Sequence, residues 1–144
     1  MSDVKLSTLQ QEWITLQTQF DSYEKHSLLI KLFNIALSGI LLFALNAGCW
    51  VLIVCAVLWL QDGIWKTFQA RMGQRLEVVE AAIKNQLEEN TTTELGMQFN
   101  SKWSQSRPSA VGLVLEYIKQ SLKPTVAYPH VILMAALFAY LYIF

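Results

Sequence analysis

Three long apolar runs constrain this chain more than any other feature of its sequence. Residues 28–45 contain a single charged side chain, and residues 126–144 contain no Asp, Glu, Lys or Arg. The middle run, residues 49–60, is shorter, but it continues to residue 65 with Asp62 as its only charge. A helix needs roughly 17–25 mostly apolar residues to cross a bilayer. The runs therefore predict transmembrane helices over residues 28–46, 49–65 and 126–144.

Composition argues against the main alternative, a soluble helical bundle with the three runs buried inside. Hydrophobic residues make up 53% of the chain and charged residues only 15%, against about 25% charged residues in a typical soluble domain. Too little polar sequence remains to cover three such helices. The net charge of zero also argues against a nucleic-acid partner, because binding to phosphates requires a basic surplus. We therefore expect an all-α integral membrane protein.

The charges that flank the three runs predict their orientation. Basic residues lie before the first run, after the second and before the third, whereas residues 46–48, between the first two runs, carry no charge. The positive-inside rule places the basic flanks in the cytosol. We expect a multi-pass protein whose N-terminus and residues 66–124 are cytosolic and whose C-terminus is at the outer face. The polar first 27 residues lack the short basic region of a signal peptide, so we expect them in the mature chain.

The N-terminal residues carry a second pattern, because apolar side chains recur at alternating spacings of three and four. Such a heptad seam predicts a helix over residues 1–27 that packs against another helix, as in a coiled coil. Residues 66–90 show a similar apolar face and predict a cytosolic helix that continues the second transmembrane helix. Both arms have equal lengths about Ala47, so we expect an antiparallel stalk in which Trp13 lies near residue 81. The residues expected to pack in the stalk are Leu6, Leu9, Trp13, Leu16, Phe20, Trp65, Phe68, Met72, Leu76, Val79 and Ile83.

The remaining cytosolic segment divides into a loop and a helix. Residues 91–107 are mostly polar and include three successive threonines and Gly96, which predicts a loop, either without regular structure or with a single helical turn. Pro108 suits the first turn of a helix, and apolar residues line one side of the segment that follows. We expect an amphipathic helix over residues 108–123, either on the inner membrane surface or packed against the stalk.

A stripe of polar side chains marks the first transmembrane helix, where each such group is energetically costly and thus a candidate functional residue. Ser27, Lys31, Asn34 and Ser38 are spaced by four, three and four residues and so share one face. The stripe either lines a pore in an oligomer, or it forms hydrogen bonds between helices while Lys31 extends its ammonium to the inner interface. We favour the second interpretation, because only Asn34 and Ser38 lie deep.

Lys31 also has a candidate partner on the second transmembrane helix. It lies sixteen residues before Ala47, and Asp62 lies fifteen residues after it, so an antiparallel hairpin brings the two to the same level. Pairing lowers the cost of both charges in a membrane. We therefore predict an intramembrane ion pair between Lys31 and Asp62. The alternative is that both side chains reach water independently.

The sequence predicts no catalytic, cofactor-binding or metal site. Cys49 and Cys55 point to different faces of one helix, and no Cys/His cluster accompanies them. His26 and His130 lie at the inner ends of the first and third transmembrane helices, where a lone His is usually solvated or caps a helix. No nucleophile with a nearby base, Gly-rich phosphate loop or paired-carboxylate motif is legible. We therefore expect that the protein is not an enzyme.

The hairpin and its exit helix together carry a family resemblance. The exit segment reads LWLQDGIWKTFQARMGQRLEVVE over residues 58–80, and its pattern comprises Trp65, Phe68, Arg75, Leu76 and Glu80. A polar N-terminal helix, a two-span hairpin and this exit helix resemble small bacterial inner-membrane proteins, namely the RipA-like octameric membrane proteins and the SLATT-domain proteins. The resemblance covers roughly residues 10–90, and the third span at residues 126–144 departs from the two-span plan. It implies a homo-oligomer in the bacterial inner membrane, and the SLATT-like members imply pore formation.

The combined patterns predict a function of binding and assembly. We expect a non-enzymatic scaffold or interaction protein that self-assembles in the inner membrane, with membrane lipids, further copies of itself and an unidentified membrane protein as candidate partners. The alternative is a pore- or channel-forming oligomer whose axis is lined by the polar stripe.

Overall fold

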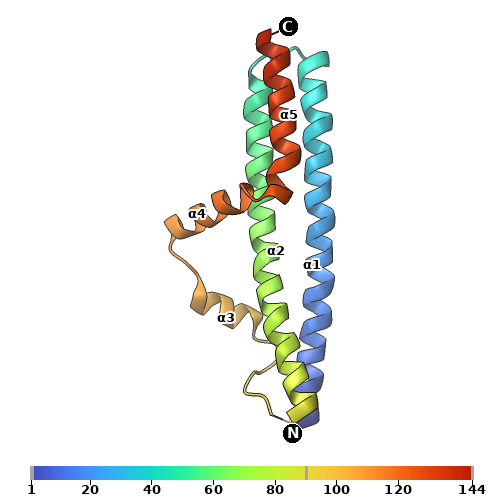
Figure 1. Cartoon of the computed structure of the whole chain (residues 1–144), viewed down its shortest axis with the longest axis vertical. Helices are drawn as coiled ribbons and strands as arrows, with labels where there is room; N and C mark the ends of the chain where they lie inside the picture. Colours follow the sequence, from blue (N-terminus) through green and yellow to red (C-terminus); the bar gives the residue numbers. More distant parts are fainter. Residues whose placement is uncertain (1, 90, 144) are drawn as a thin grey trace. The chain divides into compact units, whose positions relative to one another are not determined.

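Helices make up most of the chain in the computed structural model, which describes residues 2–89 and 91–143 (Figure 1). No strand occurs in these ranges. Helix α2, helix α5, and α1 together with the π-helical turn η1 contain stretches long and apolar enough to cross a membrane. The all-helical class and the three apolar helices are thus confirmed, while insertion into a membrane remains a prediction. The elements are α1 (Ser2–Gly39), η1 (Ile40–Ala44), α2 (Trp50–Glu89), α3 (Phe99–Ser106), α4 (Ala110–Ser121) and α5 (Pro124–Ile143).

The helix ends differ in part from the predicted boundaries. The first transmembrane helix, predicted to reach residue 46, ends in η1, where the Leu45 N–H donates to the Ile40 carbonyl at 3.2 Å. Asn46 and Gly48 then adopt left-handed conformations with φ of 47° and 57°, which turn the chain into α2. Residue 1, where one predicted segment begins, and residues 90 and 144, where two others end, lie outside the described residues.

The segment 91–107 is not a loop throughout, because it contains the eight-residue helix α3. Local signals for this helix are weak, since its N-terminus has no side-chain cap. Its order comes from tertiary contacts. The Trp103 ring meets the Phe68 ring edge-on, with centroids 6.2 Å apart, and the Arg71 guanidinium carbon lies 5.3 Å from the Trp103 ring centroid.

The chain forms two compact units, and both α1 and α2 contribute to each of them. Unit 1 comprises Met1–Ser22 and Phe68–Ser109, and unit 2 comprises Tyr23–Thr67 and Ala110–Phe144. Unit 1 therefore holds the N-terminal part of α1, the C-terminal part of α2 and helix α3. Unit 2 holds the apolar parts of α1 and α2 together with α4 and α5.

In unit 1, α1 and α2 pack antiparallel in nearly the predicted register. The Trp13 indole N–H donates to Glu80 Oε1 at 2.8 Å, one residue from the predicted level of residue 81. Seven residues later on α1, the Phe20 ring approaches Gly73 so closely that a Cβ there would lie 3.3 Å from it. The heptad seam is thus used within the chain.

The predicted stalk residues divide between the two units. Leu9 packs with Val79 and Ala82 in a buried cluster that Trp13 and Ile83 flank. Trp65 belongs instead to unit 2, where its ring stacks on Tyr23 with centroids 4.8 Å apart. The other predicted stalk residues that are buried are Leu16, Met72 and Leu76.

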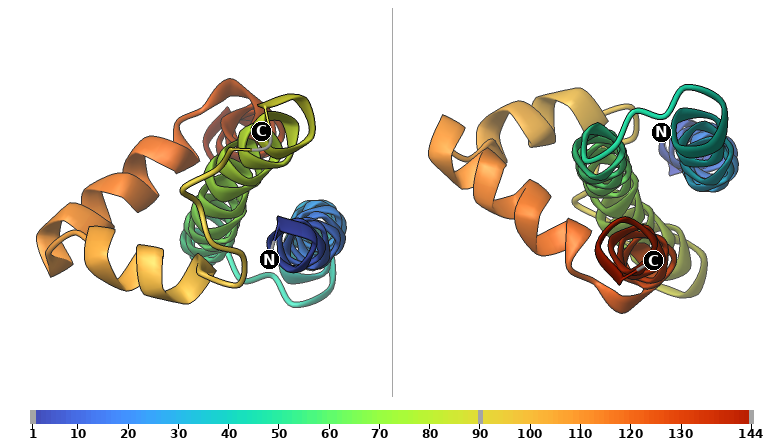
Figure 2. Two further views of the ribbon diagram at one scale, coloured as in Figure 1. Left: turned by 90° about the horizontal axis from the view of Figure 1, so that it is seen from below. Right: turned by 90° about the horizontal axis from the view of Figure 1, so that it is seen from above.

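In unit 2, helix α5 packs beside the apolar parts of α1 and α2. Viewed from above, these three helices stand at the corners of a triangle (Figure 2, right). Leu42, Val51, Cys55 and Leu137 form a buried apolar cluster among them. The three predicted transmembrane segments therefore form one packed group.

The corner between α4 and α5 is fastened to α2 at a glycine. The Trp59 indole N–H donates to the Ser121 carbonyl at 2.9 Å, and Gln120 Nε2 donates to the Lys66 carbonyl at 3.2 Å. Between these contacts lies Gly63, where an added Cβ would lie 1.8 Å from Ser121 Oγ and 3.0 Å from Ser121 Cα. Only glycine lets the backbone of α4 approach α2 this closely.

Replacing Gly63 by alanine tests this approach. We expect Gly63→Ala to lower the free energy of unfolding in detergent by about 1–3 kcal/mol, the usual cost of overpacking. Gly39→Ala is the matched control, because a Cβ there has no atom within 4 Å, and it should be neutral or slightly stabilising. Equal stability of the two variants would show that the corner is not tightly docked.

Candidate functional site

The carboxylate of Asp62 is the centre of a buried polar cluster in unit 2. Asp62 lies on α2 and is fully buried. Its Oδ1 accepts a hydrogen bond from Ser27 Oγ at 2.5 Å, and its Oδ2 lies 2.7 Å from Lys31 Nζ and 3.2 Å from His130 Nε2. These donors come from α1 and α5. One carboxylate therefore connects all three helices.

The two charges that the sequence pairs, Lys31 and Asp62, lie together in the structure. Lys31 Nζ also donates to Ser27 Oγ at 2.6 Å, and the same hydroxyl donates onward to Asp62. The Lys31 ammonium thus contacts the carboxylate both directly and through Ser27. Two of its N–H groups have acceptors in this arrangement, whereas a simple ion pair would satisfy one. Whether the pair lies within a bilayer remains a prediction.

His130 was expected to be a solvated or capping residue, and this expectation is wrong. Its side chain is buried, with 1% exposed. Asn34 Nδ2, which can only donate, lies 2.9 Å from His130 Nδ1, and this contact favours the tautomer in which Nδ1 accepts and Nε2 carries a proton toward Asp62. In the sequence, no nearby charge marked this histidine as a partner of the ion pair.

The polar stripe on α1 faces the interior of unit 2. Ser27, Asn34 and Ser38 are fully buried. Asn34 uses its amide fully, since Nδ2 also donates to the Cys55 carbonyl at 3.3 Å and Oδ1 accepts from Ser38 Oγ at 3.3 Å. The arrangement fits the interpretation that the stripe forms hydrogen bonds between helices.

The contacts of the cluster hold charges in place between helices. Ser27 Oγ bonds to the carboxylate and not to a histidine nitrogen, so the geometry of an activated serine is not formed. The Trp59 ring stacks over His130, with centroids 6.3 Å apart, and covers one face of the imidazole. Among the described residues, no group of three His, Cys, Asp or Glu side chains is placed to hold a metal ion. The contacts of Asp62 with Ser27, Lys31 and His130 cross-link three helices electrostatically.

Unit 1 has its own buried ion cluster, centred on Arg75. Its guanidinium Nε and Nη2 donate to the two carboxylate oxygens of Glu12 at 2.9 and 3.1 Å, and both side chains are buried. Nη1 donates to Glu94 Oε2 at 3.1 Å, and Nη2 also reaches the Leu95 carbonyl at 3.1 Å. Glu12 Oε2 in turn accepts from the Met97 N–H at 2.7 Å. The cluster straps residues 94–97 onto the helix pair.

The strap was not predicted from the sequence. Glu12 lies one residue before Trp13, beside the heptad seam, where charges often pair with a neighbouring helix, and Arg75 is one of the basic residues that follow the second apolar run. Their common partners lie in the segment that was predicted to be a loop. Gly96 supplies part of the explanation, because a Cβ there would lie 2.6 Å from the Thr8 backbone. Glu12 beside the seam and Gly96, two residues after Glu94, are local signals that could have indicated this docking.

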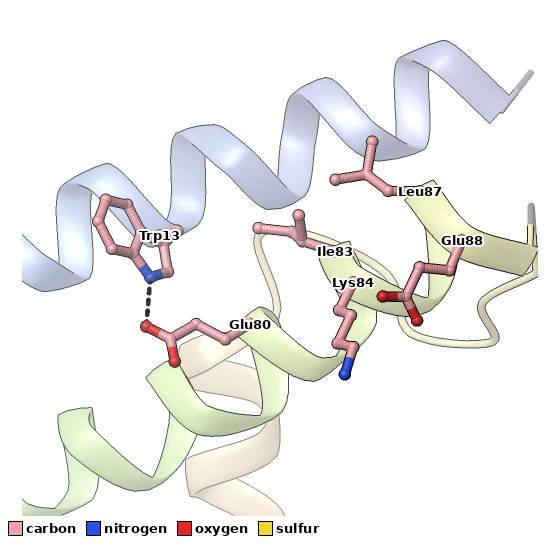
Figure 3. A pocket seen from close by; sticks show the side chains of 6 residues that line it. All are labelled: Trp13, Glu80, Ile83, Lys84, Leu87 and Glu88. Atoms are coloured by element: carbon pink, nitrogen blue, oxygen red, sulfur yellow. Dashed lines mark hydrogen bonds between the residues drawn. The ribbon is translucent and has the colours of Figure 1, made fainter.

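An open groove lies between the N-terminal part of α1 and the C-terminal part of α2, within unit 1. It is lined by Trp13, Glu80, Ile83, Lys84, Leu87 and Glu88. Figure 3 shows Ile83 and Leu87 turned toward α1, while Lys84 and Glu88 point away from it. In sites for small molecules, a few polar groups point into an apolar pocket. The polar groups on the rim of this groove do not point into it in that way.

Three comparisons with known proteins found no match. The chain matches no protein-family model, no curated protein and no solved structure. The site is therefore assigned on its geometry alone.

The Arg75 cluster predicts a pH dependence of the stability of unit 1. The hydrogen bond from Arg75 holds the pKa of Glu94 below its usual value, although partial burial opposes this shift, and the positive charge of Lys102 adds to it. Because the pKa is lowered by folding, the stabilisation is complete above the unfolded pKa of about 4.3. It is lost as the pH falls through the lower pKa of the folded state.

We expect the unfolding midpoint of the wild-type protein to fall between about pH 5 and pH 3. Glu94→Gln removes the titrating group, so its midpoint should fall less over this range and should be lower than that of the wild type at pH 7. Glu77→Gln, which replaces an exposed glutamate on α2, is the control for general charge effects. The same pH profile in Glu94→Gln and Glu77→Gln would contradict the role of the strap.

Proposed function

We propose that this chain is an integral protein of the bacterial inner membrane that crosses the bilayer through α1, α2 and α5. We further propose that it assembles with copies of itself into a non-enzymatic membrane scaffold. Lysines and arginines next to the apolar helices favour a cytosolic N-terminus and an outer C-terminus by the positive-inside rule. The resemblance to RipA-like and SLATT-domain proteins is consistent with such an oligomer.

The distribution of polarity in unit 2 supports the membrane location. Large apolar side chains cover its outer surface, and among them Phe33, Val57 and Phe138 are each more than half exposed. The polar side chains Ser27, Asn34, Ser38, Asp62 and His130 are turned inward and are at most 1% exposed. A soluble protein does not expose an apolar surface of this extent. Lipid chains, or the apolar faces of neighbouring copies, are the surroundings that it fits.

The burial of the polar stripe is the single observation that favours a scaffold over a pore. Ser27, Asn34 and Ser38 bond to partners within unit 2. A pore lined by these residues would require α1 to turn away from α2 and α5, which would leave Asp62 and His130 without their partners. Because a buried charge without a partner costs several kcal/mol, the paired arrangement is the more stable one.

The proposal is tested by the mass and the conductance of the purified protein. In nanodiscs, native mass spectrometry should give a single mass that is two or more times the chain mass of 16.4 kDa. In liposomes at neutral pH the protein should give no ion conductance above that of empty liposomes.

Two outcomes would contradict the proposal. A monomer in nanodiscs over a range of protein concentrations would exclude the homo-oligomeric scaffold. Ion conductance by the wild-type protein would favour the pore if it changes in Asn34→Leu and stays unchanged in Phe33→Leu. Phe33 is the matched control, because it is the neighbouring residue and its side chain is exposed.

A further inference from the structure

Helix α4 presents an apolar face that the described residues leave largely exposed. Val111, Val114, Leu115 and Ile118, together with Leu122 just beyond its end, are 46% to 71% exposed. Their spacings of three, one, three and four residues place them on one stripe of a helix. The opposite side carries Glu116 and Gln120, so the helix is amphipathic.

Basic side chains border this apolar face. Lys119 on α4 and Lys123 just beyond its end are both exposed. An apolar stripe flanked by lysines is typical of a helix that lies in the boundary between the lipid headgroups and acyl chains. Anionic headgroups complement the two ammonium groups.

The orientation of α4 within unit 2 agrees with such a position. Figure 1 shows α4 leaving the base of α5 sideways, across the direction in which α5 and the neighbouring part of α2 run. The connection is short and ordered, because α4 ends at Ser121 and α5 begins at Pro124, and the Val126 N–H donates to the Lys123 carbonyl at 2.9 Å. Contacts of Trp59 and Gly63 with Ser121 fix the corner to α2. When α5 crosses the bilayer, α4 is therefore held in the plane of its surface.

We propose that α4 is an interfacial helix that binds the leaflet which α5 enters, with its apolar stripe among the acyl chains and Lys119 and Lys123 at anionic headgroups. This proposal rests on the membrane location proposed above, because α5 must be inserted for α4 to meet the surface. It goes further by assigning a lipid-binding surface outside the transmembrane helices.

Depth-dependent fluorescence quenching tests the proposal on the full chain in nanodiscs. Single cysteines for an environment-sensitive fluorophore are introduced as Ile118→Cys on the apolar stripe and Glu116→Cys on the opposite side. The background carries Cys49→Ser, and the remaining Cys55 is fully buried and thus protected from labelling. Lipids with a nitroxide on the acyl chain should quench the label at position 118 at least about twofold more than the label at position 116.

A third label separates the failure of this proposal from the failure of the membrane location. Ile132→Cys places the fluorophore on the exposed face of α5, where acyl-chain nitroxides should quench it strongly. Quenching at position 132 without quenching at 118 would overturn the interfacial helix and leave the membrane location intact. Absence of quenching at both positions would overturn the membrane location itself. Leu115→Cys, on the same stripe, repeats the test in case Ile118→Cys perturbs the helix.

The same preparation tests whether the lysines bind anionic headgroups and whether a second copy of the chain, instead of lipid, covers the apolar stripe. Nanodiscs with phosphatidylglycerol should give stronger quenching at position 118 than nanodiscs with phosphatidylcholine alone, and the double variant Lys119→Gln/Lys123→Gln should remove the difference. Equal quenching in both lipids would overturn the role of the anionic headgroups. Disulfide cross-linking between two Ile118→Cys chains, without nitroxide quenching, would show that a second copy covers the stripe and would overturn the proposal.

Discussion

Unit 2 depends on the buried carboxylate of Asp62. A charge removed from water costs several kcal/mol unless it is paired and its remaining oxygen lone pairs are satisfied. Ser27, Lys31 and His130 supply these interactions, and they come from two helices other than the one that carries Asp62. Separation of any one helix from the group leaves a charge or a polar group without its partner. In the proposed membrane location the apolar helices have no hydrophobic drive to associate, so such polar contacts and close packing would hold them together.

The same interaction explains why the outer surface of unit 2 is so apolar. The polar groups of the Asp62 cluster have their partners inside the group of three helices, so the outer faces of α1, α2 and α5 are free to carry large apolar residues. One residue along the chain from Asp62, Gly63 admits the corner between α4 and α5. The ion pair and the close helix contact thus lie together, and the corner directs α4 away from the three helices.

The helices and the ion pair were predictable because their signals are local or follow from symmetry. Apolar runs mark the three long helices, and the short uncharged turn near Ala47 fixes the register of the two arms, which places Lys31 opposite Asp62. The role of His130 was not predictable in this way. It lies on α5, and no turn of known length relates its level to that of Asp62. Helix α3 and the contacts of Arg75 likewise depend on tertiary packing, which local propensity does not reveal.

The most direct test of the central interaction is a double-mutant cycle on Lys31 and Asp62, measured as the free energy of unfolding in detergent. Lys31→Met and Asp62→Asn should each destabilise the protein by on the order of 3 kcal/mol, because each leaves a buried group without its partner. We expect the double variant to be less destabilised than the sum of the two, by about 1 kcal/mol or more. Simple additivity of the two losses would contradict an ion pair that holds the helices of unit 2 together.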